Sequence, residues 1–318
     1  MHKVLVLGNV RPEGLDILRS FAELTVLPEP ARREDILACI GDMDAMLHKI
    51  GKVDREIVSQ QTKLRIIARH GVGLDDLDLD AIAERGISVS ITTDANSNAV
   101  AEATLGLIFA ALRHIPRGEA MIKRDRRWAR ETLMGRELKG STVGIIGFGR
   151  IGRLVAGCVS ALGCTVIVHD ADPQTASRTD FDLVSFEDLL ARADIISIHC
   201  PLTSATRHLI DADALRLVKP DCIIVNTSRG ALIDTQALAS AAREGRIGGA
   251  ALDVFDPEPP DFDDAVFTCD NVITTPHVAA MTVEAQLAMA TGAATEIRRV
   301  LLERLPPTND VLAKRESI

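Results

Sequence analysis

The sequence predicts an α/β protein made of two doubly wound domains, each with a parallel sheet covered by helices. Short apolar runs typical of buried strands alternate with helical patterns through the first hundred residues, and this alternation resumes at Val143. A glycine-rich turn follows the first strand of the second series. The length of 318 residues also suits two domains. Alternation of strands and helices implies parallel strands with helices on both faces of the sheet.

Five strands and four helices are expected in the first hundred residues. The strands are the apolar runs 3–7, 24–27, 45–48, 64–68 and 87–91, and the helices are the segments 13–21, 33–40, 54–60 and 77–85. Gly8 follows the first strand without the spaced glycines of a phosphate-binding turn. We therefore expect that this domain does not hold a dinucleotide.

A long helix is expected at 99–115, with apolar residues nearly all round it and hence buried on most sides. A charged segment, 123–130, carries the only tryptophan, Trp128. Six strands follow, and a last helical pattern covers 283–302; the strands are 143–146, 165–169, 195–199, 222–226, 249–252 and 272–274. We predict that residues 1–98 and 288–318 form one domain and residues 99–287 the other.

The segment 143–152 is the most informative part of the chain. A buried apolar strand leads into Gly-x-Gly-x-x-Gly and then into a helix. Gly147 permits the tight turn, Gly149 lets the backbone approach a pyrophosphate, and Gly152 lets helix and strand pack closely. The N–H groups at the start of the helix then bind the phosphates. The alternative is a glycine turn in an unrelated βαβ unit.

The second strand of this unit ends in an acid, Asp170, 18 residues after Gly152. The acid that binds the adenosine ribose of a dinucleotide is expected about 20 residues on. A carboxylate accepts hydrogen bonds from both ribose hydroxyls and repels a 2′-phosphate, so Asp170 favours NAD. The residues after it, Ala171-Asp172-Pro173, include no Lys or Arg of the kind that would favour NADP.

Composition argues against nucleic acids and membranes as partners. The net charge is −9 and aromatic residues make up 3% of the chain. The apolar stretch 99–115 is interrupted by Glu102 and Arg113, which makes it too short and too charged to span a bilayer. The six cysteines lack any metal-binding spacing, so we expect reduced thiols, a cytoplasmic protein and no metal. No signal peptide is expected, because Met1 leads almost directly into a strand.

Three polar patches follow strands of the second domain, where open α/β sheets bind their ligands. In 226–230, Arg229 is able to hold a carboxylate or carbonyl with two hydrogen bonds. In 252–259, prolines fix a turn that presents acids such as Glu258. In 275–277, His277 is suited to proton transfer near neutral pH. Each residue also has an ordinary alternative, as a surface ion pair, a loop acid or a helix cap. Together they indicate a hydride-transfer site with an acid–base histidine.

With these patches, the order of motifs along nearly the whole chain resembles that of the D-isomer-specific 2-hydroxyacid dehydrogenases. The similarity is greatest to the short D-3-phosphoglycerate dehydrogenase-like and glyoxylate/hydroxypyruvate reductase-like members. It rests on Asn96 and on the segments 69–75, 99–102, 147–152, 201–203, 226–230, 252–255 and 275–277. The resemblance implies a flavodoxin-like substrate domain and a Rossmann NAD-binding domain, with the active site in the cleft between them. It also implies a homodimer through the NAD-binding domain, for which the segment around Trp128 is a plausible arm.

The resemblance assigns roles to individual residues. His277 matches the acid–base histidine, Glu258 the acid that supports it, and Arg229 the arginine that binds substrate. Asp253 matches the acid that contacts the nicotinamide carboxamide. The backbone of 71–73 matches the cradle for the substrate carboxylate. The implied cofactor-binding set is Thr104, Gly147, Gly149, Arg150, Ile151, Gly152, Asp170, Cys200, Pro201, Thr206, Thr227, Asp253 and His277. The implied substrate-binding set is Arg69, His70, Gly71, Val72, Gly73, Asn96 and Arg229.

The substrate stays open at this point. Arg69 and His70 flank the cradle and either read a second anionic group, such as a phosphate or sulfonate, or pair within the first domain and line the cleft. The chain ends at Ile318, so we expect no extra regulatory domain. An NADH-sensing corepressor is the alternative from another functional class. An NAD-dependent formate dehydrogenase is a further alternative, but that family carries Gln as the partner of the histidine, and Glu258 favours hydroxy-acid chemistry.

Overall fold

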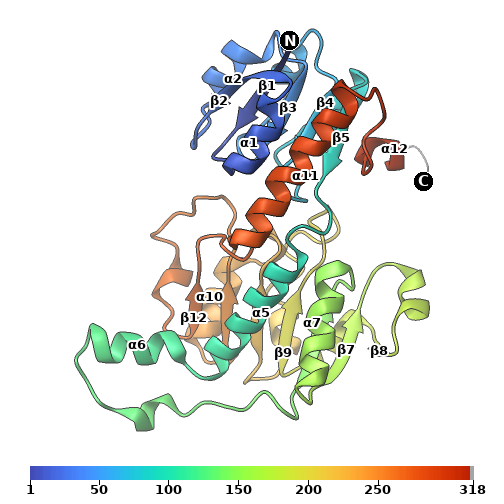
Figure 1. Ribbon diagram of the computed structural model, residues 1–318. Helices are drawn as coiled ribbons and strands as arrows, with labels where there is room; N and C mark the ends of the chain where they lie inside the picture. The colour runs from blue at the N-terminus through green and yellow to red at the C-terminus, as the bar shows by residue number, and fades with distance from the viewer. Residues whose placement is uncertain (316–318) are drawn as a thin grey trace. The chain divides into compact units, whose positions relative to one another are not determined.

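The computed structural model describes residues 1–315, which form two compact units (Figure 1). The first unit comprises Met1–Asn96 and the chain from Met281 onward, and the second comprises Ser97–Ala280. Each unit contains one sheet whose strands all pair in parallel. Two doubly wound parallel sheets are therefore confirmed. The predicted first domain ran to residue 318, and residues 316–318 lie outside the described part of the chain.

The sheet of the first unit has the strand order β2-β1-β3-β4-β5, the flavodoxin-like order. Alternate residues of each strand face opposite sides, so Val4 packs with α1 and α11 while Leu5 packs with α2, α3 and α4. The strands are β1 (His2–Leu7), β2 (Ala22–Leu27), β3 (Ala45–His48), β4 (Ile66–Arg69) and β5 (Ser88–Ile91). The helices are α1 (Pro12–Arg19), α2 (Arg33–Ile40), α3 (Arg55–Gln60), α4 (Leu79–Glu84), α11 (Val283–Leu301) and α12 (Val311–Arg315).

The sheet of the second unit has the order β12-β11-β10-β9-β6-β7-β8, which contains the Rossmann order. Val143 and Ile145 face α5 and α7, and Ile146 lies on the face covered by α8, α9 and α10. The strands are β6 (Thr142–Ile146), β7 (Thr165–His169), β8 (Asp182–Leu183), β9 (Ile195–Ile198), β10 (Ile223–Asn226), β11 (Gly249–Leu252) and β12 (Val272–Thr274). The helices are α5 (Ser97–Leu112), α6 (Ile115–Lys123), α7 (Arg150–Ala161), α8 (Phe186–Arg192), α9 (Ala214–Leu217) and α10 (Thr235–Arg243).

The long helix predicted at 99–115 is wrong only over its last three residues. The helix α5 ends at Leu112, and His114 adopts a left-handed backbone with φ 51°. Pro116 then lies in the first turn of α6, the one helical position that tolerates its missing N–H. A single helix therefore cannot run through this segment. Burial is also confined to one side of α5, since Phe109 is 38% exposed.

The strand prediction omitted β8, an edge strand of two exposed residues that has no apolar alternation to detect. The predicted boundary at 287/288 lies inside α11, whereas the units divide at 280/281, before this continuous helix begins. Within residues 1–315, no single helix is long and apolar enough to cross a membrane, although the bent pair α5 and α6 passes that test when combined.

Candidate active site

The glycine turn between β6 and α7 has the backbone that the motif requires. Gly147 has φ 90°, in the region that favours glycine. A methyl group on Gly152 would overlap the carbonyl oxygen of Gly147, so this glycine lets the helix approach the strand. A methyl group on Gly149 would meet no atom within 4 Å, which leaves open space beside the backbone there. The start of α7 also has no side-chain cap at Gly149. These features fit a pyrophosphate at the helix N-terminus.

Asp170 fixes the conformation of this turn. One carboxylate oxygen accepts from the N–H of Phe148 at 2.5 Å, and the other accepts from the N–H of Asp172 at 2.8 Å. The acid at the end of β7 thus lies beside the glycine turn after β6. A group held in this way presents its remaining lone pairs next to the turn, which is where a ribose would lie if the pyrophosphate bound there.

Strands β6 and β9 are neighbours whose following segments leave the sheet in opposite directions, the point at which such sheets bind ligands. A methyl group on Gly147 would overlap the backbone of His199 and Cys200, the first residues after β9. Thr206 closes the next loop, because its hydroxyl donates to the carbonyl of Pro201 at 2.7 Å. Burial raises the pKa of Cys200 to about 11, so this thiol stays protonated near neutral pH. Three of the predicted cofactor residues, Cys200, Pro201 and Thr206, therefore belong to one folded loop.

Two further residues of the predicted cofactor set meet in the interior of the second unit. The hydroxyl oxygens of Thr104 in α5 and Thr227 after β10 are 2.9 Å apart, and Thr104 also donates to the carbonyl of Val100. Both side chains are buried. This contact joins α5 to the loop that carries Arg229.

The loop after β10 positions Arg229. The buried side chain of Asn226 accepts from the N–H of Ser228 at 3.0 Å and donates to the carbonyl of Arg229 at 2.8 Å. One guanidinium nitrogen of Arg229 donates to the carbonyl of Ser228 at 2.6 Å. Gly230 follows, and a side chain there would collide with the backbone of Phe255. The Arg229 loop therefore packs directly against the loop that follows β11.

The loop after β11 brings Glu258 to His277. The imidazole Nδ1 of His277 lies 2.7 Å from one carboxylate oxygen of Glu258, and the other oxygen accepts from the N–H of Phe255 at 3.0 Å. This carboxylate therefore favours the His277 tautomer or ion that carries a proton on Nδ1. It leaves the other ring nitrogen, Nε2, as the one that can exchange a proton with a bound molecule.

The electrostatics of this pair suit proton transfer. The hydrogen bond to Glu258 raises the pKa of His277, against a lowering by burial and by the charge of Arg229. Burial acts to raise the pKa of Glu258, but the hydrogen bonds from His277 and the Phe255 N–H outweigh it and hold that pKa below its usual value. Arg229 acts on both groups, which places its charge close to them. The imidazolium is thus stabilised beside an ionised carboxylate.

Asp253 organises the segment that carries His277. Its carboxylate, 1% exposed, accepts from the hydroxyl of Thr275 at 2.6 Å and from the N–H groups of Val278 and Ala279 at 2.9 and 2.8 Å. His277 itself has φ 52°, a left-handed backbone that is uncommon for residues other than glycine. The resemblance implied that Asp253 contacts the nicotinamide, and the structure shows it bonded to the histidine segment.

In the first unit, Arg69 is engaged by its own domain. One guanidinium nitrogen lies 2.9 Å from the carboxylate of Asp76 and 2.5 Å from Nδ1 of His48. His48 is fully buried, and its Nε2 lies 2.7 Å from the carbonyl of Gly51. Burial lowers the pKa of His48 to about 4, so this histidine is neutral and accepts the bond from Arg69. This arrangement supports the alternative in which Arg69 pairs within its domain.

The predicted cradle at 71–73 offers two free N–H groups. The N–H of Gly71 donates to the hydroxyl of Thr92 at 2.9 Å, so it is not available to a ligand. The N–H groups of Val72 and Gly73 have no hydrogen-bond partner within the described residues. Two adjacent N–H groups at the end of β4 are suited to a carboxylate.

Comparison with known proteins agrees with this geometry. Residues 105–279 match the family model of the D-isomer-specific 2-hydroxyacid dehydrogenase, NAD-binding domain. A glyoxylate reductase of Thermofilum pendens is 38% identical over 96% of this chain and 93% of its own length. The chain belongs to the D-isomer-specific 2-hydroxyacid dehydrogenase family. The Rossmann domain predicted for nicotinamide cofactor binding is thereby confirmed.

Other members of the family differ from this chain in length. A D-3-phosphoglycerate dehydrogenase of Methanocaldococcus jannaschii is 42% identical over 95% of the chain, but the match covers only 58% of that relative. The solved structure of a glyoxylate reductase from Paecilomyes thermophila has a TM-score of 0.89 and 30% identity, covering 98% of this chain and 99% of the other. The chain therefore spans little more than half of some relatives and nearly all of others.

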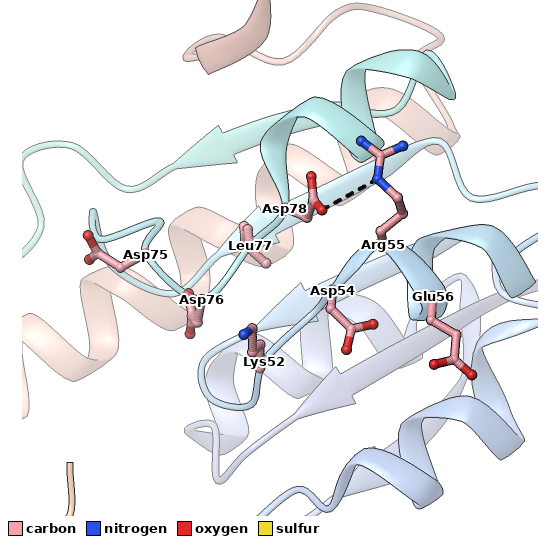
Figure 2. Close-up of a pocket in the computed structure, with 8 residues that line it drawn as sticks. All are labelled: Lys52, Asp54, Arg55, Glu56, Asp75, Asp76, Leu77 and Asp78. Carbon is pink, nitrogen blue, oxygen red and sulfur yellow. Dashed lines mark ion pairs between the residues drawn. The ribbon is translucent and has the colours of Figure 1, made fainter. Parts of the chain in front are cut away.

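A pocket of about 370 Å³ lies elsewhere on the first unit of this family member (Figure 2). Five of the eight residues that line it are acidic: Asp54, Glu56, Asp75, Asp76 and Asp78. Arg55 pairs with Asp78 across its rim, at 3.8 Å. An acidic lining repels an anionic 2-oxo acid, so this pocket is unsuited to the substrates of the family.

Within residues 1–315, no group of three or more His, Cys, Asp or Glu is placed to hold a metal ion.

Several residues that shape this candidate site were missed in the sequence. His48 and Asp76 hold Arg69, Thr92 binds the Gly71 backbone, and Thr275 binds Asp253. His48, Asp76 and Thr92 belong to none of the motifs, and His48 and Thr92 each bind a residue 21 positions away in sequence. Asn226 and Thr275 alone had a signal, since both lie at the carboxyl end of a strand in a polar patch.

Proposed function

We propose that this chain is an NAD-dependent oxidoreductase that transfers a hydride between nicotinamide and C2 of a D-2-hydroxy acid or 2-oxo acid. The 3-phosphoglycerate and the hydroxypyruvate or glyoxylate couples are the candidate substrates. The observation that carries the proposal is the Glu258–His277 hydrogen bond of 2.7 Å, with the charge of Arg229 beside it, on the sheet that also carries the glycine turn.

The proposed cofactor is NAD. The glycine turn at Gly147, Gly149 and Gly152 and the start of α7 would hold the pyrophosphate, and Asp170 the adenosine ribose. When bound, the nicotinamide accepts the hydride from C2 or gives it back. The negative charge of Asp170 supports NAD over NADP, because a 2′-phosphate would lie against a carboxylate.

His277 is the proposed acid and base. In oxidation, its Nε2 would take the proton of the C2 hydroxyl, while bound NAD would supply the acceptor for the hydride from C2. In reduction, the imidazolium returns that proton to the carbonyl oxygen. Glu258 accepts the Nδ1 proton and stabilises the imidazolium. Arg229 bridges the carboxylate and the C2 oxygen, which orients the substrate and stabilises the charge that develops on oxygen.

The N–H groups of Val72 and Gly73 are proposed to bind the substrate carboxylate. This leaves the remaining polar groups of the first unit to recognise the part of the substrate beyond C2. We also propose that the chain forms a homodimer through the second unit. The support is the arm formed by α6 and the residues after it, where Trp128 and Met134 are each 83% exposed and Ile115 is 56% exposed.

The experiment that tests this function is oxidation of NADH and NADPH by the purified protein with glyoxylate, hydroxypyruvate, 3-phosphohydroxypyruvate, sulfopyruvate and pyruvate. We expect NADH-dependent turnover of at least one of them. An NADH sensor would bind the cofactor tightly and turn over none of the panel. The Arg229, Glu258 and His277 arrangement supports the enzyme, because a protein that only binds NADH has no need of an acid–base pair.

A further inference from the structure

A buried ring nitrogen without a partner belongs to His70, the residue that directly precedes the proposed carboxylate cradle in the sequence. His70 follows β4 directly and is 5% exposed, yet its Nε2 has no hydrogen-bond partner among residues 1–315. Its main-chain N–H donates to the carbonyl of His48 at 2.9 Å, which fixes the residue as a continuation of the strand. A buried polar atom left unpaired costs stability, so its presence in a native protein calls for an explanation, of which a bound partner is one.

A second unpaired acceptor belongs to the neighbouring loop. The loops after β4 and β5 are joined by Thr92, whose N–H donates to the carbonyl of Gly71 at 3.0 Å and whose hydroxyl accepts from the Gly71 N–H. Four residues later, Oδ1 of Asn96 is buried and has no partner in the described part of the chain. The carboxyl edge of this sheet thus holds unfilled acceptors in addition to the free N–H groups of Val72 and Gly73.

The chemistry of His70 decides what it can bind. Burial lowers its pKa to about 4, helped by the positive charge of Lys49, so the ring is neutral. The main-chain carbonyl groups of His70 itself and of Gln286 in α11 act as hydrogen-bond acceptors for the ring. Because Nε2 has no partner, we assign these acceptors to Nδ1, which then carries the single proton. Nε2 is left as a lone pair that requires a donor.

The neighbouring Arg69 does not make the surroundings of His70 Nε2 an anion-binding site. Arg69 is neutralised by Asp76 at 2.9 Å and held by His48. Phosphate and sulfonate oxygens are acceptors at neutral pH, and a second acceptor facing Nε2 would be repelled. A hydroxyl group supplies the missing donor and is small enough to approach a buried ring.

We propose that His70 Nε2 accepts a hydrogen bond from a hydroxyl group on C3 of the substrate, so that this enzyme prefers 3-hydroxy-2-oxo acids to their 3-deoxy and 3-phospho counterparts. The inference rests on the proposed function, because it takes Val72 and Gly73 as the carboxylate site. It makes His70 a specificity-determining residue and leaves proton transfer to His277.

The test compares kcat/KM for hydroxypyruvate, pyruvate, 3-phosphohydroxypyruvate and glyoxylate, with NADH, in wild type and His70→Leu. Pyruvate differs from hydroxypyruvate only in the hydroxyl, and glyoxylate has no C3. The wild type is expected to prefer hydroxypyruvate to pyruvate by about tenfold or more, since a site built to bond a hydroxyl disfavours the analogue that lacks it. In His70→Leu that ratio falls toward one while glyoxylate turnover stays within about twofold. His70→Gln, which keeps an acceptor, restores part of the preference.

Glyoxylate turnover serves as the folding control within each preparation, and Lys49→Met tests the competing anion site. An unchanged hydroxypyruvate-to-pyruvate ratio in His70→Leu overturns the inference while the proposed function stands. The inference is also overturned if the wild type prefers 3-phosphohydroxypyruvate to hydroxypyruvate and Lys49→Met abolishes that preference. Absence of turnover with every 2-oxo acid overturns both proposals.

Discussion

The main-chain N–H of His277 donates to the carbonyl oxygen of Asp253 at 2.8 Å, and the Asp253 carboxylate accepts from the next two N–H groups, of Val278 and Ala279. One buried acid therefore holds three consecutive peptide units around a histidine whose backbone is left-handed. A left-handed backbone at a residue other than glycine persists only where surrounding contacts fix it. Asp253 is in this sense a positioning residue for His277, whatever else it contacts.

Asp253→Asn is expected to slow catalysis more than it weakens cofactor binding. The amide group cannot accept at both positions, so one N–H of the histidine segment loses its partner, at a cost of about 1–3 kcal/mol in stability. We expect kcat to fall at least tenfold and the NADH Kd to change by less than threefold, measured by steady-state kinetics and NADH fluorescence titration. Asp263→Asn, at an exposed position, is the matched control. A large loss of NADH affinity with kcat retained would instead support the nicotinamide contact.

Glu258→Gln should move the pH dependence of the reaction to lower pH. The hydrogen bond to Glu258 raises the pKa of His277, so removal of the carboxylate charge lowers that pKa. Reduction needs the imidazolium and declines as pH rises through its pKa, so this decline begins at lower pH in the variant. Oxidation needs the neutral ring, so its rise also begins at lower pH. The measurement is kcat/KM against pH in both directions, with Glu187→Gln as control; identical profiles would remove Glu258 from its role.

Asp170→Ser should weaken discrimination between the two nicotinamide cofactors. The substitution removes the negative charge beside the expected 2′ position and keeps a hydroxyl that can accept from the Phe148 N–H. We expect the ratio of Kd for NADPH to Kd for NADH to fall about tenfold, or ~1.4 kcal/mol. Isothermal titration with both cofactors measures this ratio, and Asp180→Asn controls for the loss of one charge. No change in the ratio would show that another group selects the cofactor.

Two glycines of α7 give a matched pair of substitutions. Gly152→Ala places a methyl group against the carbonyl oxygen of Gly147, whereas Gly157→Ala, on the same helix, meets no atom within 4 Å. We expect Gly152→Ala to destabilise the protein by about 1–3 kcal/mol and to weaken NADH binding. Gly157→Ala should be neutral or stabilising by about 0.5–1 kcal/mol. Thermal unfolding with and without NADH distinguishes the two, and equal effects would contradict a close contact at Gly152.

The sequence predicted those features that depend on local spacing. Every strand expected from the apolar runs is present, with ends within about two residues of those predicted. Asp170 was selected by its spacing from the glycine turn, and its carboxylate lies beside that turn in the structure. The break at His114 was also readable, because Pro116 excludes a continuous helix, but the apolar character of the segment outweighed it.

Features that arise from tertiary contacts could not be predicted from the sequence. Nothing in the sequence pairs Thr92 with Gly71, Asp76 with Arg69 or Thr275 with Asp253, since each contact joins segments that meet only in the folded domain. Such contacts also decide whether Arg69 is available to a second anionic group of the substrate or pairs within its own domain. Pattern alone also gives no backbone angle for His277, whose conformation depends on the distant Asp253.

The most direct test of the central claim is a comparison of wild type with His277→Gln, measuring NADH binding and NADH oxidation with a 2-oxo acid in the same preparations. We predict that the wild type turns over a 2-oxo acid, and that the variant binds NADH within about twofold of wild type while kcat falls about 10²–10⁴-fold. Turnover by the variant at the wild-type rate would contradict the acid–base role of His277. Tight NADH binding by both proteins without turnover by either would contradict the dehydrogenase function itself.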